Sequence, residues 1–506
     1  MSDKSNRIFK TAVLMVVITL GAKLLGMLRD ILLASNYGTT ADAIAYDAAS
    51  RLPVLLFDFV LGGVVTAAFI PVFNEILVKK GKAEAFDYAN KYINMILLIT
   101  LIITAVGIIF SDTLVGLIAP DISSSVSATA SYLTRIMFPM VIFTGLAFSF
   151  VGLLQSFGNY LLPATISFAS NLIMVAYFFT FNLRFGITGL AIAMLVGWGV
   201  QAIIQMPSVY KIGYRYKPTL DFRSEYIKKS LLMAIPILLS SWTQPVCNFI
   251  NSRFASSISE GRAFSAIGYA NRLYIIIVGV FTFVATNLLF PKLSKSQAEG
   301  DTTEADKLTS SSIRALLLVI LPISIGIFVF SEPLISLIYE RGEFTHDDVL
   351  LTASALRYFA IGMPFFAVNE VYAKRFFAEQ KTIAPMLSSI ISICVNIGAV
   401  ILLAKYFGLS GIALSSSIAV AVNLLINHLI FTKKGKNFIK KDDLAVIVKM
   451  VLATALMGAV VYFVYRYSSL SPILAVAAGA SLGCVLYFAV CYILGVPEVK
   501  NFLKKK

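Results

Sequence analysis

The sequence predicts an all-α integral membrane protein with about fourteen transmembrane helices, arranged as two parallel six-helix lobes and a C-terminal helical pair. Apolar stretches of about twenty residues, the length that spans a bilayer, recur along all 506 residues. Only 14% of the residues are charged, against about a quarter in soluble globular proteins. A repeated sequence pattern also relates the first half of the chain to the second.

The apolar stretches set the expected helices, and the charged or turn-forming residues between them set the loops. The fourteen expected spans lie near 11–35, 45–73, 88–111, 127–155, 160–182, 187–210, 229–254, 264–290, 311–330, 350–377, 383–405, 410–432, 443–466 and 471–494. The basic start of the chain leads into a stretch that is too long for a signal peptide and lacks a small-residue cleavage site. We therefore expect an uncleaved first helix.

The repeat holds a nearly constant offset of about 220 residues. The matching segments are 185–191 with 407–413, 111–115 with 331–335, 49–52 with 270–273, and Pro71 with Pro291. This offset covers six expected helices, and an even number of spans gives both halves the same orientation. We therefore expect a first lobe at 1–222, a second lobe at 223–441 and a helical pair with a basic tail at 442–506.

The net charge of +15 is distributed over alternate loops. Basic residues gather in the connections near 79–82, 211–229, 292–295, 374–381 and 433–441, whereas the other connections are neutral or acidic. This alternation follows the positive-inside rule, so both termini are expected in the cytoplasm. The chain has no contiguous polar basic domain, and we expect no nucleic-acid partner.

Enzyme chemistry and a bound cofactor are not expected. The four cysteines lie inside apolar segments without metal-ligand spacing, and the chain has only two histidines. A membrane glycosyltransferase is the rival from another class. It would need acidic residues in the first outer loop to hold a metal-bound sugar phosphate, and Asp42 and Asp47 are the candidates there.

Charged residues inside the expected helices are the main functional signal. They are Lys23, Arg29 and Asp30 in the first helix, Asp47, Arg51 and Asp58 in the second, and Arg272 in the eighth. A Lys, Arg or Asp at the middle of a spanning helix costs about 2.5–3.5 kcal/mol, so these side chains must face protein or a water-filled cavity. Basic residues outnumber acidic ones, and guanidinium groups suit phosphate oxygens. We therefore predict a cationic cavity that binds an anion.

Two alternatives stay open for these charges. Asp47 and Arg51 are one helical turn apart, which allows them to neutralise each other. Arg29 can also reach the headgroups by extending its side chain. If the cavity exists, the repeat-equivalent Arg51 and Arg272 are expected to face each other across the lobe interface.

The seventh expected helix carries a polar stripe. Its members, spaced three or four residues apart on one face, are Ser241, Gln244, Asn248 and Asn251. Such a stripe indicates either hydrogen bonds between helices or a cavity wall that contacts sugars or amides.

Several short motifs resemble one known family. They are Gly-Met-Leu-Arg-Asp at 26–30, Ala-Asp-Ala at 41–43, Arg-Leu-Pro at 51–53, Ala-Phe-Ile-Pro at 68–71, Tyr-Ala-Asn-Arg-Leu at 269–273 and Glu-Arg-Gly-Glu-Phe-Thr at 340–345. Together they resemble the MurJ (MviN) lipid II flippases of the multidrug/oligosaccharidyl-lipid/polysaccharide exporter superfamily. The resemblance is collinear over nearly the full length.

The resemblance implies a multi-pass protein of the bacterial plasma membrane. It would export lipid II, the undecaprenyl-diphosphate-linked peptidoglycan precursor, from the inner to the outer leaflet by alternating access. It also implies a cavity lined by helices 1, 2, 7 and 8 and a groove for the lipid tail at helices 13 and 14. The family's essential charged positions correspond here to Lys23, Arg29, Asp30, Asp42 and Arg272.

Other properties complete these expectations. We expect a monomer that contacts lipid II and membrane lipids and is driven by the membrane potential or an ion gradient. A flippase for another polyprenyl-linked oligosaccharide and a drug/cation antiporter of the same superfamily remain alternatives. The antiporters usually have twelve helices and an acidic cavity, whereas the charges here are mainly basic.

Overall fold

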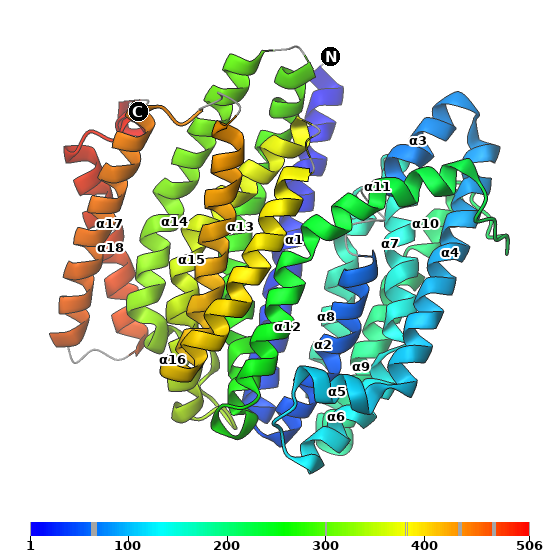
Figure 1. Cartoon of the computed structure of the whole chain (residues 1–506), viewed down its shortest axis with the longest axis horizontal. Helices are drawn as coiled ribbons and strands as arrows, with labels where there is room; N and C mark the ends of the chain where they lie inside the picture. Colours follow the sequence, from blue (N-terminus) through cyan, green and yellow to red (C-terminus); the bar gives the residue numbers. More distant parts are fainter. Residues whose placement is uncertain are drawn as a thin grey trace. The chain divides into compact units, whose positions relative to one another are not determined.

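The structure is a computed structural model that describes residues 2–61, 68–298, 301–379, 381, 383–433, 438–467 and 472–504. Within these ranges the backbone is helical or irregular, and no β-strand occurs (Figure 1). The predicted all-α class is therefore confirmed. The chain divides into two compact units.

Unit 1 contains Met1–Pro245 and Glu260–Arg262. Its helices are α1 (Ser2–Tyr37), α2 (Ala41–Leu61), α3 (Ile70–Lys79), α4 (Lys82–Ile109), α5 (Ser111–Ile118), α6 (Ser124–Met137), α7 (Met140–Ser156), α8 (Leu161–Thr180), α9 (Asn182–Ile203), α10 (Met206–Lys211) and α11 (Glu225–Ser241). Within this unit α1 packs on α8, and α2 packs on α6.

Unit 2 contains Val246–Ser259 and Ala263–Lys506. Its helices are α12 (Thr243–Ala255), α13 (Arg262–Ala298), α14 (Thr302–Tyr339), α15 (His346–Ala378), α16 (Ile383–Thr432), α17 (Lys441–Tyr467), α18 (Pro472–Ile493) and α19 (Pro497–Lys504), and a 3-10 turn at Ser259–Gly261 precedes α13. The C-terminal α17 and α18 pack together and against α14 (Figure 1). The predicted lobe boundaries at 222 and 441 stay a prediction.

Ten helical segments in the described part of the chain are long and apolar enough to cross a membrane. One of them, α16, has 50 residues and covers two of the expected spans, 383–405 and 410–432. Its backbone breaks at Gly408, where φ is 54°, a left-handed value that glycine adopts without a Cβ clash. The multi-span class is confirmed, and the exact count of fourteen stays a prediction.

The internal repeat reappears in the backbone. Gly186 inside α9 has φ 52° and ψ −146°, and its repeat partner Gly408 has φ 54° and ψ −132°. Arg135 donates from Nε to the Ser111 hydroxyl at 2.7 Å, and Arg357 donates in the same way to Ser331 at 3.1 Å. Both units therefore break and fasten their helices at equivalent positions.

The expected seventh helix, 229–254, is not continuous. It forms α11 and α12 with a break at Trp242. Pro245 lies three residues after the break, and a proline clashes with the carbonyl four residues before it, here that of Ser241. The Trp242 indole donates to the carbonyl oxygen of Phe59 at 3.0 Å, which fastens the break to α2.

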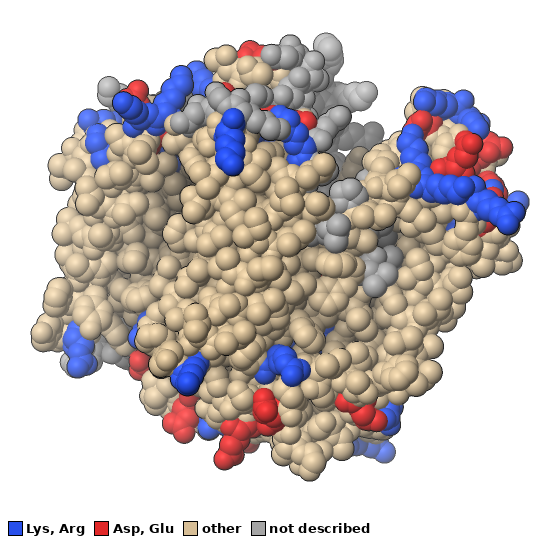
Figure 2. All heavy atoms as spheres, viewed as in Figure 1, with Lys and Arg blue, Asp and Glu red and all other residues tan. Residues whose placement is uncertain are grey.

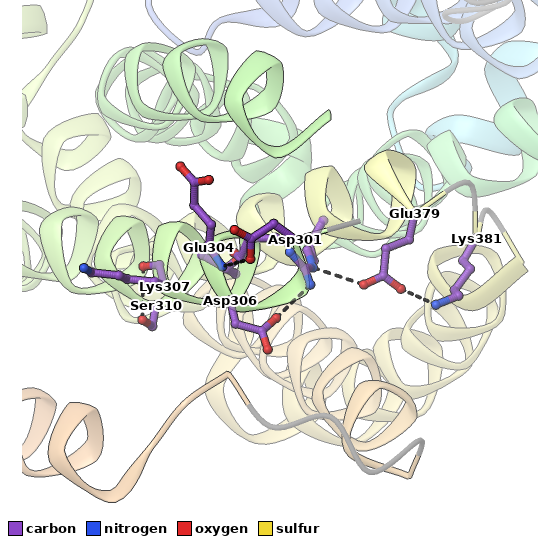
Figure 3. A network of polar contacts seen from close by, with 10 residues as sticks. Asp301, Glu304, Asp306, Lys307, Ser310, Glu379 and Lys381 are labelled. Carbon is purple, nitrogen blue, oxygen red and sulfur yellow. Dashed lines mark hydrogen bonds and ion pairs between the residues drawn. The ribbon is translucent and has the colours of Figure 1, made fainter. Parts of the chain in front are cut away.

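A network of ion pairs in unit 2 is centred on one buried arginine (Figure 3). Arg375 near the end of α15 is fully buried and donates to Asp306 on α14 at 2.7 Å and to Glu379 at 3.2 Å. Glu379 also pairs with Lys381, and the guanidinium lies over the ring of Phe431 on α16. The network joins three helices through one cation.

Candidate functional site

The guanidinium of Arg29 on α1 is held in place within unit 1. It donates from Nη1 to Oδ1 of Asn171 on α8 at 2.9 Å, and from Nη2 to Oδ1 of the neighbouring Asp30 at 2.8 Å. The Arg29 side chain keeps 28% exposure, whereas that of Asp30 keeps 5%. The cation is therefore oriented by protein groups and remains partly available to a ligand.

Asn171 was not predicted from the sequence, although an Asn inside an apolar stretch is a signal. Gly26 on α1 lets it approach, since a Cβ at Gly26 would lie 3.3 Å from the Asn171 amide nitrogen. The packing of α1 on α8 thus places an amide acceptor beside Arg29.

The turn between α1 and α2 is also fastened to other parts of unit 1. Tyr37 donates to Asn182 at 2.6 Å, and Asn182 donates to Asn36 at 2.9 Å. Arg262 donates from Nε to the Thr39 hydroxyl at 3.1 Å. These polar contacts, which the sequence did not predict, fix the start of α2.

The remaining predicted residues of α1 and α2 lie in different surroundings. Lys23 is half-buried on α1. Asp42 is exposed in the first turn of α2, where the positive end of the helix dipole stabilises a carboxylate. Asp42 therefore lies near the end of the helical pair, about two turns of α1 beyond Arg29.

Asp47 and Arg51 form the ion pair that the alternative prediction described. The guanidinium lies 4.0 Å from the carboxylate; the Arg51 side chain is 18% exposed and the Asp47 side chain is 0% exposed. The pair lies one turn apart on α2. Part of the positive charge that Arg51 brings to this region is thus neutralised on its own helix.

The polar stripe, which runs from the end of α11 along α12, is only partly available for a ligand. Gln244 is exposed, Asn248 is half-buried and Asn251 is buried. Asn251 donates to the Ser416 hydroxyl of α16 at 2.6 Å, which is the predicted bond between helices. The side chain of Ser241 lies outside the described part of the structure.

Arg272 on α13 is half-buried in unit 2. Its guanidinium carbon lies 5.4 Å from the centre of the Tyr269 ring. Tyr269 in turn packs against Tyr339 and Phe344, whose ring centres lie 5.2 and 5.5 Å away. An aromatic cluster therefore supports this cation. Its predicted position opposite Arg51 stays a prediction.

No group of three or more His, Cys, Asp or Glu side chains that could hold a metal ion occurs among the described residues. The candidate residues described above include the cations Arg29 and Arg272 and the amides Gln244 and Asn248. Such groups bind and orient an anion through charge-assisted hydrogen bonds.

A family model described as "Lipid II flippase MurJ" matches residues 33–478. The chain belongs to this family. The probable lipid II flippase MurJ of Buchnera aphidicola subsp. Schizaphis graminum is 28% identical over 500 residues, covering 97% of each chain. The probable lipid II flippase MurJ of Rickettsia prowazekii is also 28% identical, covering 98% of this chain and 100% of the relative.

Solved structures show the same fold. A lipid II flippase MurJ in an inward closed conformation matches with a TM-score of 0.82 at 22% identity, covering 95% of this chain and 98% of that one. An inward-facing multidrug resistance transporter of the MATE family and MOP superfamily matches with a TM-score of 0.70 at 15% identity, covering 83% and 97%. The MurJ family fold is thus shared with exporters of other cargo.

Proposed function

We propose that this chain moves lipid II from the inner to the outer leaflet of the bacterial plasma membrane for cell-wall synthesis. Membership of the MurJ family supports this substrate. The two-unit fold, shared with transporters solved in inward-facing and outward-facing conformations, supports alternating access. The protein is a transporter, and we propose that it changes no covalent bond in its cargo.

The observation that carries the proposal is the oriented, partly exposed guanidinium of Arg29. The diphosphate is the strongest charge on lipid II, and moving it unpaired through hydrocarbon is prohibitive. A guanidinium offers two parallel donors to phosphate oxygens. Because Asn171 and Asp30 already fix the side chain, little conformational entropy is lost when the phosphate binds.

Arg272 is the second proposed phosphate ligand. Arg29 and Arg272 belong to different units. A ligand shifts a conformational equilibrium only through different contacts in the two states. Cations from both units would therefore link diphosphate binding to the motion of one unit against the other. Lys23, Asp30, Asp42, Arg51, Gln244, Asn248 and Asn251 remain proposed members of the same site.

The test is complementation in a bacterium whose own lipid II flippase can be depleted. Each charge-assisted bond to the diphosphate is worth about 1.5–3 kcal/mol. We therefore expect Arg29→Ala and Arg272→Ala to abolish rescue while the protein still accumulates in the membrane. Lys at either position should rescue partly, since it keeps the charge but loses the planar fork.

Arg184→Ala, which removes an exposed arginine in the first turn of α9, is the matched control and should rescue fully. Normal growth with both Arg29→Ala and Arg272→Ala at native expression would refute the proposed phosphate site. Failure of the unchanged chain to rescue, despite normal accumulation, would instead favour another polyprenyl-linked glycan as cargo.

The orientation and driving force are further parts of the proposal. The loop charges support cytoplasmic termini, so single cysteines at Lys433 and Glu343 should label from opposite sides of the membrane. Labelling from the same side would contradict this topology. We propose that the membrane potential or an ion gradient drives transport, and that α17 and α18 carry the lipid tail.

A further inference from the structure

The connection between α10 and α11 is fastened along the side of α4. Tyr214 donates to Asn90 at 2.7 Å, and the backbone N–H of Lys217 donates to the same oxygen at 2.9 Å. Tyr216 donates to Asn94 at 2.6 Å, and the Asn94 amide donates to the Lys217 carbonyl at 2.8 Å. Two asparagines thus hold residues 214–217 against the helix.

The contact with Asn94 sets the depth in the bilayer at which we expect this connection. α4 carries no charged side chain between Tyr92 and Phe110, a stretch about 28 Å long that matches the hydrocarbon core. Lys91 lies just before this stretch and pairs with Asp87 at 2.9 Å and with Asp221 at 3.4 Å. We therefore expect the connection where the headgroups meet the hydrocarbon.

At this depth the connection exposes large apolar side chains. Leu220 is 54% exposed and Phe222 is 51% exposed, and Tyr216 is exposed to a similar degree. Aromatic side chains are enriched at this level of a membrane, since they match both its apolar and its polar side. Exposed apolar groups at the boundary lose their contact with water when they enter the lipid.

Exposed cations flank the apolar side chains. Lys217, Arg223 and Lys228 are all exposed, and Figure 2 shows Lys and Arg, interspersed with Asp and Glu, over the end of unit 1 that carries α3, α10 and the start of α11. Within residues 216–228 these three cations outnumber the acidic Asp221 and Glu225, and Asp221 also pairs with Lys91 on α4. The segment therefore carries a net positive charge beside Leu220 and Phe222.

We propose that residues 216–228 form a contact surface for anionic phospholipid headgroups. Leu220 and Phe222 enter the boundary region, and Lys217, Arg223 and Lys228 face the lipid phosphates. Apolar side chains at the boundary together with flanking cations favour an anionic lipid over a soluble acidic protein, which would need no side chains at bilayer depth. This surface lies outside the proposed substrate site and is independent of the transported cargo.

The test uses Phe222→Trp in the full-length protein reconstituted into phosphatidylcholine vesicles with phosphatidylglycerol. Either lipid is supplied in brominated form, which quenches nearby tryptophan, and the quenching of the unchanged protein through Trp198 and Trp242 is subtracted. We expect brominated phosphatidylglycerol to quench residue 222 at least about twice as strongly as brominated phosphatidylcholine at the same mole fraction.

Charge removal separates the two parts of the surface. In the Phe222→Trp background, Lys217→Gln with Arg223→Gln and Lys228→Gln should abolish the preference for the anionic lipid and leave quenching by phosphatidylcholine. The control Arg184→Gln with Lys405→Gln and Arg466→Gln removes three exposed cations elsewhere and should keep the preference. The same charge variants without Phe222→Trp report the quenching of Trp198 and Trp242 alone. This quenching should equal that of the unchanged protein, which verifies the fold.

Two results would overturn the proposal. Equal quenching by the two lipids in the original charge background would show that the cations select no anionic headgroup. Absence of quenching by both lipids would show that residue 222 lies outside the bilayer, and an acidic protein partner would then be the better explanation for the exposed cations.

Discussion

Replacing Arg375 with methionine removes the cation that joins α14, α15 and Glu379 (Figure 3). Methionine fills part of the same volume and leaves the contact with Phe431 apolar. The substitution therefore tests mainly the charge. We expect a clear loss of stability with the helical fold retained.

The expected loss of stability follows from the contacts that each carboxylate loses when Arg375 is replaced. Removing one partner of a buried ion pair costs about 3–5 kcal/mol, because a buried charge is left uncompensated. The Glu379 side chain is 3% exposed but keeps its contact with Lys381, and the Asp306 side chain is 31% exposed and can regain water. These two features place the expected cost of Arg375→Met near the lower limit, about 3 kcal/mol.

Equilibrium unfolding in mixed micelles, followed by far-ultraviolet circular dichroism, measures the difference. A double-mutant cycle with Glu379→Gln isolates the charge effect. Adding Glu379→Gln to Arg375→Met should recover part of the stability, since it removes a buried carboxylate that has lost one of its two cationic partners. Lys405→Met, an exposed cation-to-methionine change on α16, is the control and should stay within about 0.5 kcal/mol of the unchanged protein.

A loss below about 1 kcal/mol for Arg375→Met would refute the reasoning, because that is the range of exposed ion pairs. A further loss on adding Glu379→Gln would also refute it. In that case the Glu379 carboxylate would stabilise the protein through groups other than Arg375.

Two other predictions follow from polar contacts in unit 1. Asn171→Leu removes the acceptor that orients Arg29 and should lower the initial rate of lipid II transport in vesicles about tenfold, with unchanged accumulation; an unchanged rate would contradict a positioning role. Hydrogen bonds from Lys229 and then Lys79 lower the pKa of Glu75 to about 2. The Glu75 carboxylate should therefore add stability above pH 4.5, its ordinary pKa, and this contribution should disappear as the pH falls through about 2. Unfolding curves of the unchanged protein and of Glu75→Gln should differ at neutral pH and converge near pH 2, and a difference that is independent of pH would contradict this assignment.

Local sequence determined much of the repeated architecture. The Phe-Gly-x-x-Gly pattern at 185–189 and 407–411 predicts equivalent places in the two lobes, and the backbone breaks there with the same left-handed glycine conformation. Phe110 and Phe330, each followed by Ser and an acidic residue, likewise share non-helical angles near φ −99° and −96°. Equal local sequences impose equal local geometry, so these features could be predicted before the packing was known.

The contacts of Arg29 could not be predicted in this way. Its acceptor Asn171 lies 142 residues away, and the bond depends on how α1 packs on α8. Hydrophobic periodicity does not specify that packing. The break at Trp242 had a local signal in Pro245, but the apolar composition around it favoured one continuous helix. Here the backbone clash of proline outweighed the expectation drawn from hydropathy.

The two repeats share one arginine contact and differ one helical turn before another pair of equivalent arginines. The Arg–Ser contacts at 135 with 111 and at 357 with 331 are kept in both units, which indicates a shared role in fastening helices. By contrast, Asp47 pairs with Arg51 in unit 1, whereas Gly268 takes the equivalent place before Arg272 in unit 2.

The two equivalent arginines therefore have different neighbours on their own helices. In unit 1 both arginines have a carboxylate partner: Arg29 lies 2.8 Å from Asp30 and Arg51 lies 4.0 Å from Asp47, and the two arginine side chains keep 28% and 18% exposure. In unit 2, Arg272 lies over an aromatic ring and has no carboxylate one turn earlier on its helix. If the two arginines bind a diphosphate as proposed, the bound cargo would favour one conformation only through contacts that differ between the two states.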